Sequence, residues 1–223
     1  MIKPSWPEPE QAKLIAKASA FEGCSETTLQ RIYDEGDIVR FSIGHVLSSA
    51  VFIPDRVLLI LKGSARLIGK HRGQLNSLAH LGVGNIIGLA SLLRAEPCEE
   101  VCASTEVEAW SIPDTLISEI YKDDDFFRQW CTKTVFPGEL AILLDELISN
   151  SETSAYAVRD ILGEVLPLAR SIEPNLENFE ENADTIAFIS SKNTSANINS
   201  ILSPTQGIPE NRGTFNLRIL SIP

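Results

Sequence analysis

Hydrophobic residues recur at helical spacing on both sides of a central region. An apolar side along residues 11–21 predicts a first helix. A second helix is predicted from Ser25, whose hydroxyl can accept an early backbone N–H, to about Gly36. Apolar residues three and four apart predict further helices within residues 114–130 and 139–148.

Between these helices the period changes to that of β-strands. Short apolar or alternating runs are separated by Gly or Pro-Asp about every ten residues, which is typical of a β-sandwich, roll or barrel. We therefore expect a mainly β domain with flanking α-helices and about eight strands. The runs are 38–41, 46–52, 57–61, 65–68, 75–81 and 100–111.

The character of the sequence changes after Asn150. Residues 156–169 predict a helix and residues 185–190 a strand. Residues 191–206 are rich in Ser, Asn and Thr and carry few charges, which indicates a long loop or mobile linker. The last apolar run, 217–222, predicts either an edge strand or a boundary before a following module.

These patterns divide the chain into three parts. Residues 1–11, rich in Pro and charge, are expected to form a flexible arm. Residues 12–150 have the length of a complete domain. Residues 151–223 are expected to form a small α+β extension that leads towards a following module.

The acidic composition limits the classes of partner that we expect the chain to bind. The chain has 19 basic and 30 acidic residues, a net charge of -11 and a pI of about 4.8, with no basic stripe. We therefore expect neither nucleic-acid binding nor attraction to an anionic membrane. The longest apolar stretches are too short to cross a bilayer, and residues 1–8 lack the apolar segment of a signal peptide. The expected location is the cytoplasm.

Catalytic and metal-binding patterns are missing from the sequence. Cys98 and Cys102 would lie about 13 Å apart on a strand, too far to share one metal ion. All four cysteines are expected to be reduced and to pack as small core residues. The three histidines have no partner at ligand spacing, and the acidic runs at 123–125 and 177–181 lack the pattern of a calcium loop. We expect no enzyme activity, no cofactor and no metal.

Three segments carry a family resemblance through their order and spacing: Leu61–Ile68, Leu81–Leu93 and Val101–Ile112. Together they resemble the cyclic-nucleotide-binding domain family over about residues 12–148. The resemblance implies an eight-stranded β-roll of the jelly-roll type, with N- and C-terminal helices. It also implies a phosphate-binding cassette that follows the turn at 81–85.

The cassette departs from the family pattern at its two charged positions. In the family, a Glu after Phe-Gly accepts from the ribose 2′-hydroxyl, and an Arg after Pro pairs with the cyclic phosphate. Here Leu89 stands at the Glu position, and either Pro97 or Cys98 stands at the Arg position. Glu96, Glu99 and Glu100 instead bring negative charge to the place of the phosphate, which disfavours an anion. The resemblance therefore implies a degenerate cassette.

Two interpretations of the cassette stay open. The backbone after Gly88 can present N–H groups to an anion or another polar ligand, or the short helix merely closes the roll. Arg94 is the nearby cation, and we expect it to face solvent. The first hypothesis is a non-catalytic regulatory domain; the alternative is a sensor that binds a cyclic nucleotide or cyclic dinucleotide through Arg94. The candidate ligand-binding residues are Gly88, Leu89, Ala90, Ser91, Arg94, Pro97, Cys98, Glu99 and Glu100.

A second resemblance concerns Ile86–Leu93, Cys98-Glu99 and residues 103–107. These segments look like the N-terminal regulatory region of cyanobacterial peptidase-containing ABC exporters of the hemolysin-secretion type. That resemblance implies a domain at the cytoplasmic face of the inner membrane, with ATP binding and the membrane helices outside these residues. No direct membrane insertion by this segment is expected.

The expected partners are the downstream domains of the same polypeptide, or a second copy bound through the C-terminal helices. The side chains expected at this contact are Phe126, Phe136 and Leu147, and residues 156–222 are expected to cover part of the same surface. A small nucleotide is a further candidate ligand.

Overall fold

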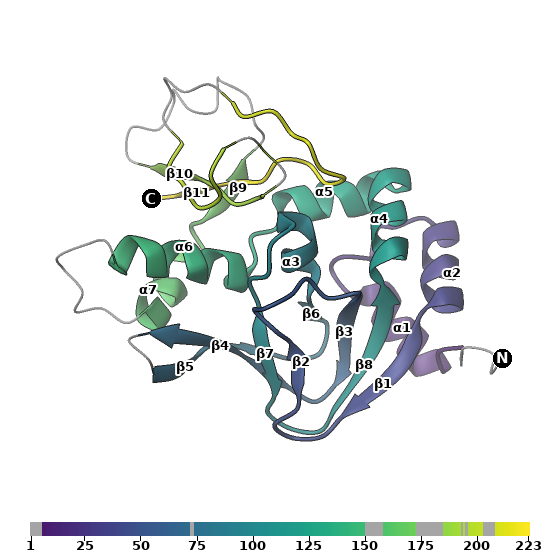
Figure 1. Cartoon of the computed structure of the whole chain (residues 1–223). Coiled ribbons are helices and arrows are strands. Elements are labelled where there is room, and N and C mark those ends of the chain that lie inside the picture. The colour runs from purple at the N-terminus through teal and green to yellow at the C-terminus, as the bar shows by residue number, and fades with distance from the viewer. Residues whose placement is uncertain are drawn as a thin grey trace.

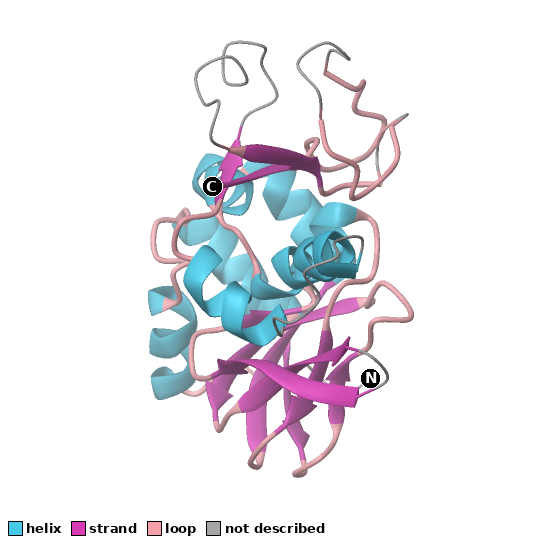
Figure 2. Cartoon of the chain, turned by 90° about the vertical axis from the view of Figure 1, so that its left-hand side faces the viewer, coloured by secondary structure: helices cyan, strands magenta, loops and turns pink. Residues whose placement is uncertain are grey.

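The computed structural model describes residues 6–71, 74–149, 158–172, 185–192, 194, 196–202 and 208–223. It has three layers: a roll of β-strands, a layer of helices and a small C-terminal sheet (Figures 1 and 2). Figure 2 shows the helices between the C-terminal strands at the top and the strands of the roll below.

Two helices precede the roll: α1 (Pro9–Lys17) and α2 (Glu26–Glu35). The hydroxyl of Ser25 caps α2 by accepting the Thr28 N–H at 3.1 Å, and Gly36 ends the helix, as predicted. The first helix is shorter than predicted, because turns follow it from residue 18. Of the predicted arm, residues 1–5 lie outside the described residues, and Pro9 already belongs to α1.

The roll contains eight antiparallel strands in two four-stranded sheets, so the predicted fold class is confirmed. The strands are β1 (Asp37–Phe41), β2 (Val46–Ser48), β3 (Arg56–Lys62), β4 (Ala65–His71), β5 (Gln74–Leu81), β6 (Ile86–Ile87), β7 (Glu100–Ala103) and β8 (Val107–Pro113). The sheet orders are β1-β8-β3-β6 and β2-β7-β4-β5. In both sheets, strands that are distant in sequence pair side by side. This is the strand arrangement of a jelly roll, which is built from two Greek keys.

Two predicted strands end differently in the structure. β2 stops at Ser48, and Val51 and Phe52 lie in an exposed turn. The run at 100–111 is two strands, because the Ser104 N–H bonds to the Ser64 carbonyl at 2.8 Å and turns the chain. The two-residue strand β6 was not predicted, because two apolar residues carry no period of their own.

The helices after the roll confirm the predicted stretches at 114–130 and 139–148. They are α4 (Asp114–Asp123), α5 (Asp125–Lys133), α6 (Pro137–Ser149) and α7 (Val158–Val165). α4 and α5 separate at Asp124, whose carboxylate caps α5 by accepting the Phe127 N–H at 3.1 Å. The acidic run at 123–125 is therefore a helix boundary.

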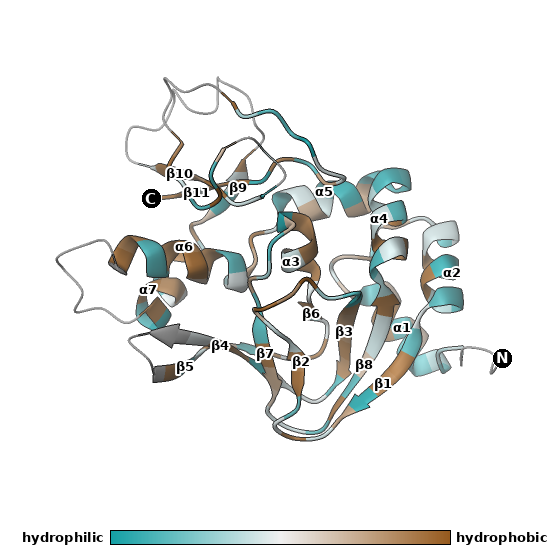
Figure 3. Cartoon of the chain, viewed as in Figure 1, coloured by the Kyte–Doolittle hydropathy of each residue, from teal (hydrophilic) through white to brown (hydrophobic). Residues whose placement is uncertain are grey.

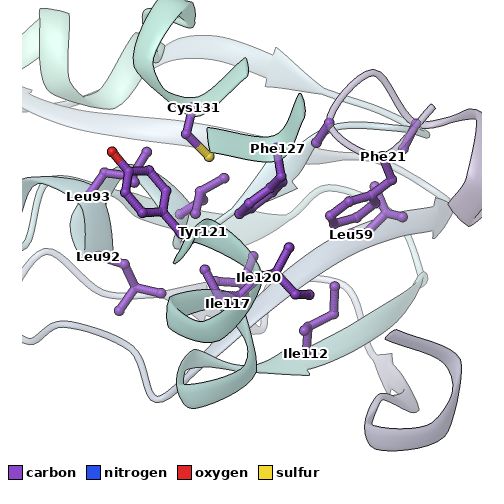
Figure 4. Close-up of a cluster of buried hydrophobic side chains, with 14 of the residues drawn as sticks. Phe21, Leu59, Leu92, Leu93, Ile112, Ile117, Ile120, Tyr121, Phe127 and Cys131 are labelled. Atoms are coloured by element: carbon purple, nitrogen blue, oxygen red, sulfur yellow. The ribbon is translucent and has the colours of Figure 1, made fainter. Parts of the chain in front are cut away.

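The main core lies between one sheet of the roll and the helices that cover it. Phe21 and Phe127 stack with their ring centroids 5.7 Å apart. Leu59 of β3 and Ile112 of β8 meet α4 there (Figure 4). A second apolar cluster fills the interior of the roll between the two sheets. It contains Leu58, Ile60, Ala65, Leu67, Leu81, Ile87, Val101, Ala103, Val107 and Ala109.

The described residues of the extension form α7 and a three-stranded antiparallel sheet in the order β10-β11-β9. The strands are β9 (Arg170–Ile172), β10 (Ile186–Ile189) and β11 (Ile219–Ile222). The prediction that the last run is an edge strand is wrong, because β11 pairs with a strand on each side. The alternative, a boundary before a following module, stays a prediction. β9 was not predicted, since three residues show no clear alternation.

Part of the predicted linker at 191–206 is bound to this sheet. The Ile189 N–H donates to the Ser200 carbonyl at 3.0 Å, and the Leu202 N–H donates to the Ala187 carbonyl at 2.8 Å. The stretch 196–202 is therefore held along β10. Residues 193, 195 and 203–206 of the predicted linker lie outside the described residues.

α6 lies between the roll and the C-terminal sheet. Its sequence is largely apolar (Figure 3). Leu140, Leu143 and Leu144 are buried in one cluster with Leu162 of α7 and Phe188 of β10. A helix that is apolar on most sides needs cover all round, and the extension supplies that cover.

Candidate functional site

The predicted cassette is a short helix, α3 (Leu89–Arg94), followed by the loop that leads into β7. Gly88 precedes the helix with a φ of 89°, in the left-handed region. A Cβ at this position would lie 2.9 Å from the Cγ of Pro54. Only glycine satisfies both conditions, so Gly88 sets the direction in which α3 starts.

The structure brings all nine predicted residues into one region, but several belong to the core. Leu89 and Ala90 are fully buried in the apolar cluster beneath the helices. The position expected to contact a ribose therefore packs against apolar side chains. Pro97 is half-buried in the loop after α3.

Ser91 and Cys98 tie the end of this loop to the helix. The Ser91 Oγ accepts the Cys98 N–H at 3.1 Å, and the two side chains meet with Oγ and Sγ 3.6 Å apart. Burial raises the pKa of the Cys98 thiol to about 12. This thiol is therefore protonated at neutral pH and is a poor nucleophile or metal ligand.

The carboxylate of Glu99 occupies the N-terminal end of α3. It accepts the Gly88 N–H at 2.9 Å, and the Ser91 N–H also donates to it. Burial raises the pKa of Glu99 to about 7, although these two bonds and Arg94 act in the opposite direction; Glu139 contributes to the increase. The amide groups that would receive an anion already have one from the chain itself.

Arg94 is buried, so the prediction that it faces solvent is wrong. Its Nε donates to the Ser190 carbonyl at 2.7 Å, and its Nη2 donates to the Oδ1 of Asn199 at 2.9 Å. Nη1 has no hydrogen-bond partner in the part of the chain that the structure describes. The partners come from the extension about one hundred residues later, and no local pattern in the sequence indicates that contact.

The other two glutamates predicted near the phosphate position point elsewhere. Glu96 pairs with the Nζ of Lys192 at 2.7 Å. The Oε2 of Glu100 accepts the Ala50 N–H at 3.0 Å. Of the three, only Glu99 lies at the start of α3.

A buried ion pair that the sequence did not indicate lies beside the cassette. Arg218 of β11 donates to both carboxylate oxygens of Glu139, at 2.6 and 3.1 Å, and both side chains are buried. The Ser190 hydroxyl donates to Glu139 at 3.0 Å. The available signals were weak: one acidic residue at the start of an apolar helix and one arginine within an apolar run.

The same arginine joins the ends of two helices. It donates to the carbonyls of Cys131 and Thr134 at the end of α5, at 2.7 and 2.8 Å. Its Cζ lies 5.6 Å from the ring centroid of Phe136. Because Glu139 belongs to the first turn of α6, Arg218 sets the junction between α5 and α6.

α6 touches the cassette directly at Gly138. A Cβ there would lie 2.8 Å from the Cγ of Glu99 and 2.9 Å from the Cys98 carbonyl oxygen. The first turn of α6 therefore rests on the loop that carries Glu99, and only a residue without a side chain fits.

We expect Gly138→Ala to destabilise the fold by about 1–2 kcal/mol, because the added methyl group meets a backbone carbonyl. Gly163 in α7 is the matched control, since a Cβ there meets nothing within 4 Å. Gly163→Ala should stabilise by about 0.5–1 kcal/mol through its helix propensity. Urea unfolding measures both, and equal stabilisation by the two variants would contradict the close approach of α6.

Comparisons with known proteins give structural likeness and no sequence match. No protein-family model matches the sequence, and no curated protein shows a significant match. The chain is similar to the sensor domain of the transcriptional regulator DNR from Pseudomonas aeruginosa, at 14% identity and a TM-score of 0.47, over 53% of this chain and 85% of that one.

Two further solved structures are similar over about half of this chain. A putative cyclic nucleotide-binding protein from Geobacter metallireducens has 17% identity and a TM-score of 0.46, over 55% of this chain and 89% of that one. A regulatory subunit of a cAMP-independent protein kinase A from Trypanosoma brucei has 15% identity and a TM-score of 0.44, over 53% of this chain. The match spans 48% of the trypanosomal subunit, about half its length.

Two further findings concern the described residues alone. They contain no helix that is long and apolar enough to cross a membrane. Within the same ranges, no three His, Cys, Asp or Glu side chains gather in a way that could hold a metal ion.

Proposed function

We propose that this chain is a non-catalytic regulatory or interaction domain of the cyclic-nucleotide-binding type, with a cassette closed by its own carboxylate. The observation that carries the proposal is the hydrogen bond from the Gly88 N–H to Glu99 at 2.9 Å. The Gly88 and Ser91 amides at the start of α3 are thus engaged. A phosphate placed beside this carboxylate would meet like charge, which costs several kcal/mol.

The alternative, a sensor that binds a cyclic nucleotide or dinucleotide through Arg94, needs that side chain to reach the ligand. Its guanidinium is buried and donates to Ser190 and Asn199 of the extension. Ligand binding through Arg94 would therefore require these two bonds to break. Direct binding measurements distinguish the closed cassette from a sensor that binds its ligand through Arg94.

We expect no binding of cAMP, cGMP or cyclic di-GMP to the full chain at micromolar concentration. Isothermal titration calorimetry at pH 7.5 tests this directly. Thermal unfolding provides a second readout, because a ligand at 100 times its Kd stabilises a protein by about 2.7 kcal/mol. A Kd below about 10 µM for any of the three would contradict the closed cassette and favour the sensor.

The proposed output element is the set of helices α4, α5 and α6, acting on a second copy or a following domain. Of the side chains predicted at this contact, Phe126 and Leu147 are half-buried. Leu147 packs against the cluster that contains Leu143 and Leu144. Phe136 is buried, and the Arg218 guanidinium lies over its ring. Sedimentation velocity over a range of concentrations measures self-association, and a monomer throughout would leave a following domain as the partner.

We further propose, from the sequence resemblance alone, that the domain regulates an ABC exporter of the peptidase-containing class. ATP hydrolysis and transport would then belong to residues outside this chain. The measurement is the ATPase rate of a purified exporter of this class with and without the domain attached. An unchanged rate would contradict this role.

A further inference from the structure

Four buried charged side chains meet where the cassette, α6 and the C-terminal sheet come together. They are Arg94, Glu99, Glu139 and Arg218. Glu139 and Arg218 form a direct ion pair at 2.6 Å. Glu99 lacks such a pair among the described residues and bonds instead to the backbone at the start of α3.

The charged side chains that shift the pKa of Glu99 come from α6 and α3. Glu139 from α6 raises the pKa of Glu99, and Arg94 from α3 lowers it. Cys98, its neighbour in the loop, is a neutral thiol. Arg218 of β11 is paired with Glu139, so its positive charge is already engaged.

The contact between Glu99 and α6 is close and direct. The Cα of Gly138 lies so near the Glu99 Cγ that a Cβ would be only 2.8 Å from it. A negative charge on Glu99 therefore develops in a buried contact, beside the acidic first turn of α6. A proton on Glu99 removes that repulsion and the cost of burying the charge.

We propose that Glu99 is a proton-dependent latch between the cassette and α6. The neutral carboxyl holds the first turn of α6 against α3, and the charged carboxylate loosens it. The inference rests on the proposed function in one respect, since α6 is there the output element. In this proposal a proton on Glu99 regulates α6, and no nucleotide is needed.

The direction and size of the expected pH effect on α6 follow from proton linkage. With α6 docked, the pKa of Glu99 is about 7, so the carboxyl keeps its proton up to about that pH. A solvated glutamate loses its proton near the ordinary pKa of 4.5. The docked state therefore binds more protons between these values, and raising the pH favours opening. From pH 6 to pH 8 the opening equilibrium of α6 should rise about tenfold.

Hydrogen–deuterium exchange of the α6 amides in the full chain tests the latch, with rates corrected for the intrinsic effect of pH. Wild type should lose about tenfold in protection from pH 6 to pH 8. Glu99→Gln keeps an acceptor for the Gly88 N–H but cannot titrate, so its protection should be independent of pH. Glu96→Gln, on the same loop and partly exposed, is the matched control and should behave as wild type.

The proposal is overturned if wild-type protection does not change with pH, or if Glu99→Gln shows the same change. If that variant does not fold, NMR of wild type with ¹³C-labelled glutamate replaces it. A Glu99 carboxyl resonance that titrates together with shifts of the α6 amides supports the latch. A carboxyl that stays charged from pH 6 to 8 overturns it.

Calorimetry with cAMP on the same samples separates this proposal from the proposed function. Nucleotide binding would contradict the closed cassette but leave the pH response of α6 intact. A missing pH response without nucleotide binding would remove the latch alone.

Discussion

Arg218→Ala should destabilise the fold by about 3–5 kcal/mol, the largest effect that we expect from a single substitution in this chain. The change leaves Glu139 buried without its cation. It also removes the donor to the Cys131 and Thr134 carbonyls at the end of α5. Urea unfolding at pH 7 measures the loss.

The penalty should come mainly from the uncompensated buried charge. Arg218→Met with Glu139→Gln should therefore recover much of the stability, because the glutamine Oε1 can accept the Phe136 N–H while its amide N–H donates to the Ser190 hydroxyl oxygen. Arg212→Ala is the control, since Arg212 and Glu210 form an exposed pair at 3.5 Å. It should change stability by less than about 0.5 kcal/mol.

Loss of this pair also bears on the proposed contact surface of the helices. Because Arg218 covers Phe136 and anchors β11, its removal should expose apolar surface of α6 and increase self-association in sedimentation experiments. A loss of less than about 1 kcal/mol, without self-association, would show that the extension is not held by this pair.

Asp124→Ala should destabilise by about 2–3 kcal/mol, because three donors lose their acceptor together. The carboxylate accepts the Ser25 N–H at 3.0 Å, the Thr28 hydroxyl at 2.8 Å and the Phe127 N–H at 3.1 Å. It thus caps α5 and joins it to the start of α2. Asp124→Asn, which keeps one capping oxygen, should lose less than half as much.

The effect of Asp124 should depend on pH in a defined direction. Burial alone would raise the pKa of this carboxyl, but the bonds from Ser25, Phe127 and Thr28 lower it overall. A folded-state pKa below the ordinary value of 3.8 means that the carboxylate stabilises the fold above that value. The contribution is lost as the pH falls further, through the folded-state pKa.

Urea midpoints at pH 6 and pH 3 test this dependence. The difference between wild type and Asp124→Ala should be larger at pH 6. The neighbouring Asp123→Ala is the control, because Asp123 is exposed and pairs with Arg31 only at 3.4 Å. A difference that grows at pH 3 would contradict the assigned direction.

Features set by neighbouring residues were predictable from the sequence. The alternation of apolar residues between 37 and 113 predicts strands, and their turn residues predict a β-sandwich, roll or barrel. The cap at Ser25 and the stop at Gly36 were confirmed, because a helix end depends on backbone groups only three or four residues away. The short strands β6 and β9 were not predicted, since two or three residues do not establish a period.

The candidate site was predictable in position but not in contacts. The family resemblance placed Gly88, Ser91, Cys98 and Glu99 in one cassette, and the structure joins Gly88 to Glu99 and Ser91 to Cys98. The structure adds that Glu99 itself bonds to the amides of α3. The sequence showed an acidic residue near the cassette, but the direction of its side chain depends on how the loop is packed beneath α6.

By itself, then, the local pattern of the sequence predicted a mainly β domain with flanking helices, and the family resemblance specified a roll. Only the tertiary structure decided that Arg94 is buried, that β11 is central and that Arg218 pairs with Glu139, which is 79 residues away. The physical reason is that burial and pairing of a charge depend on which distant surface covers it. The extension provides that surface, and its contacts leave no periodic signal along the chain.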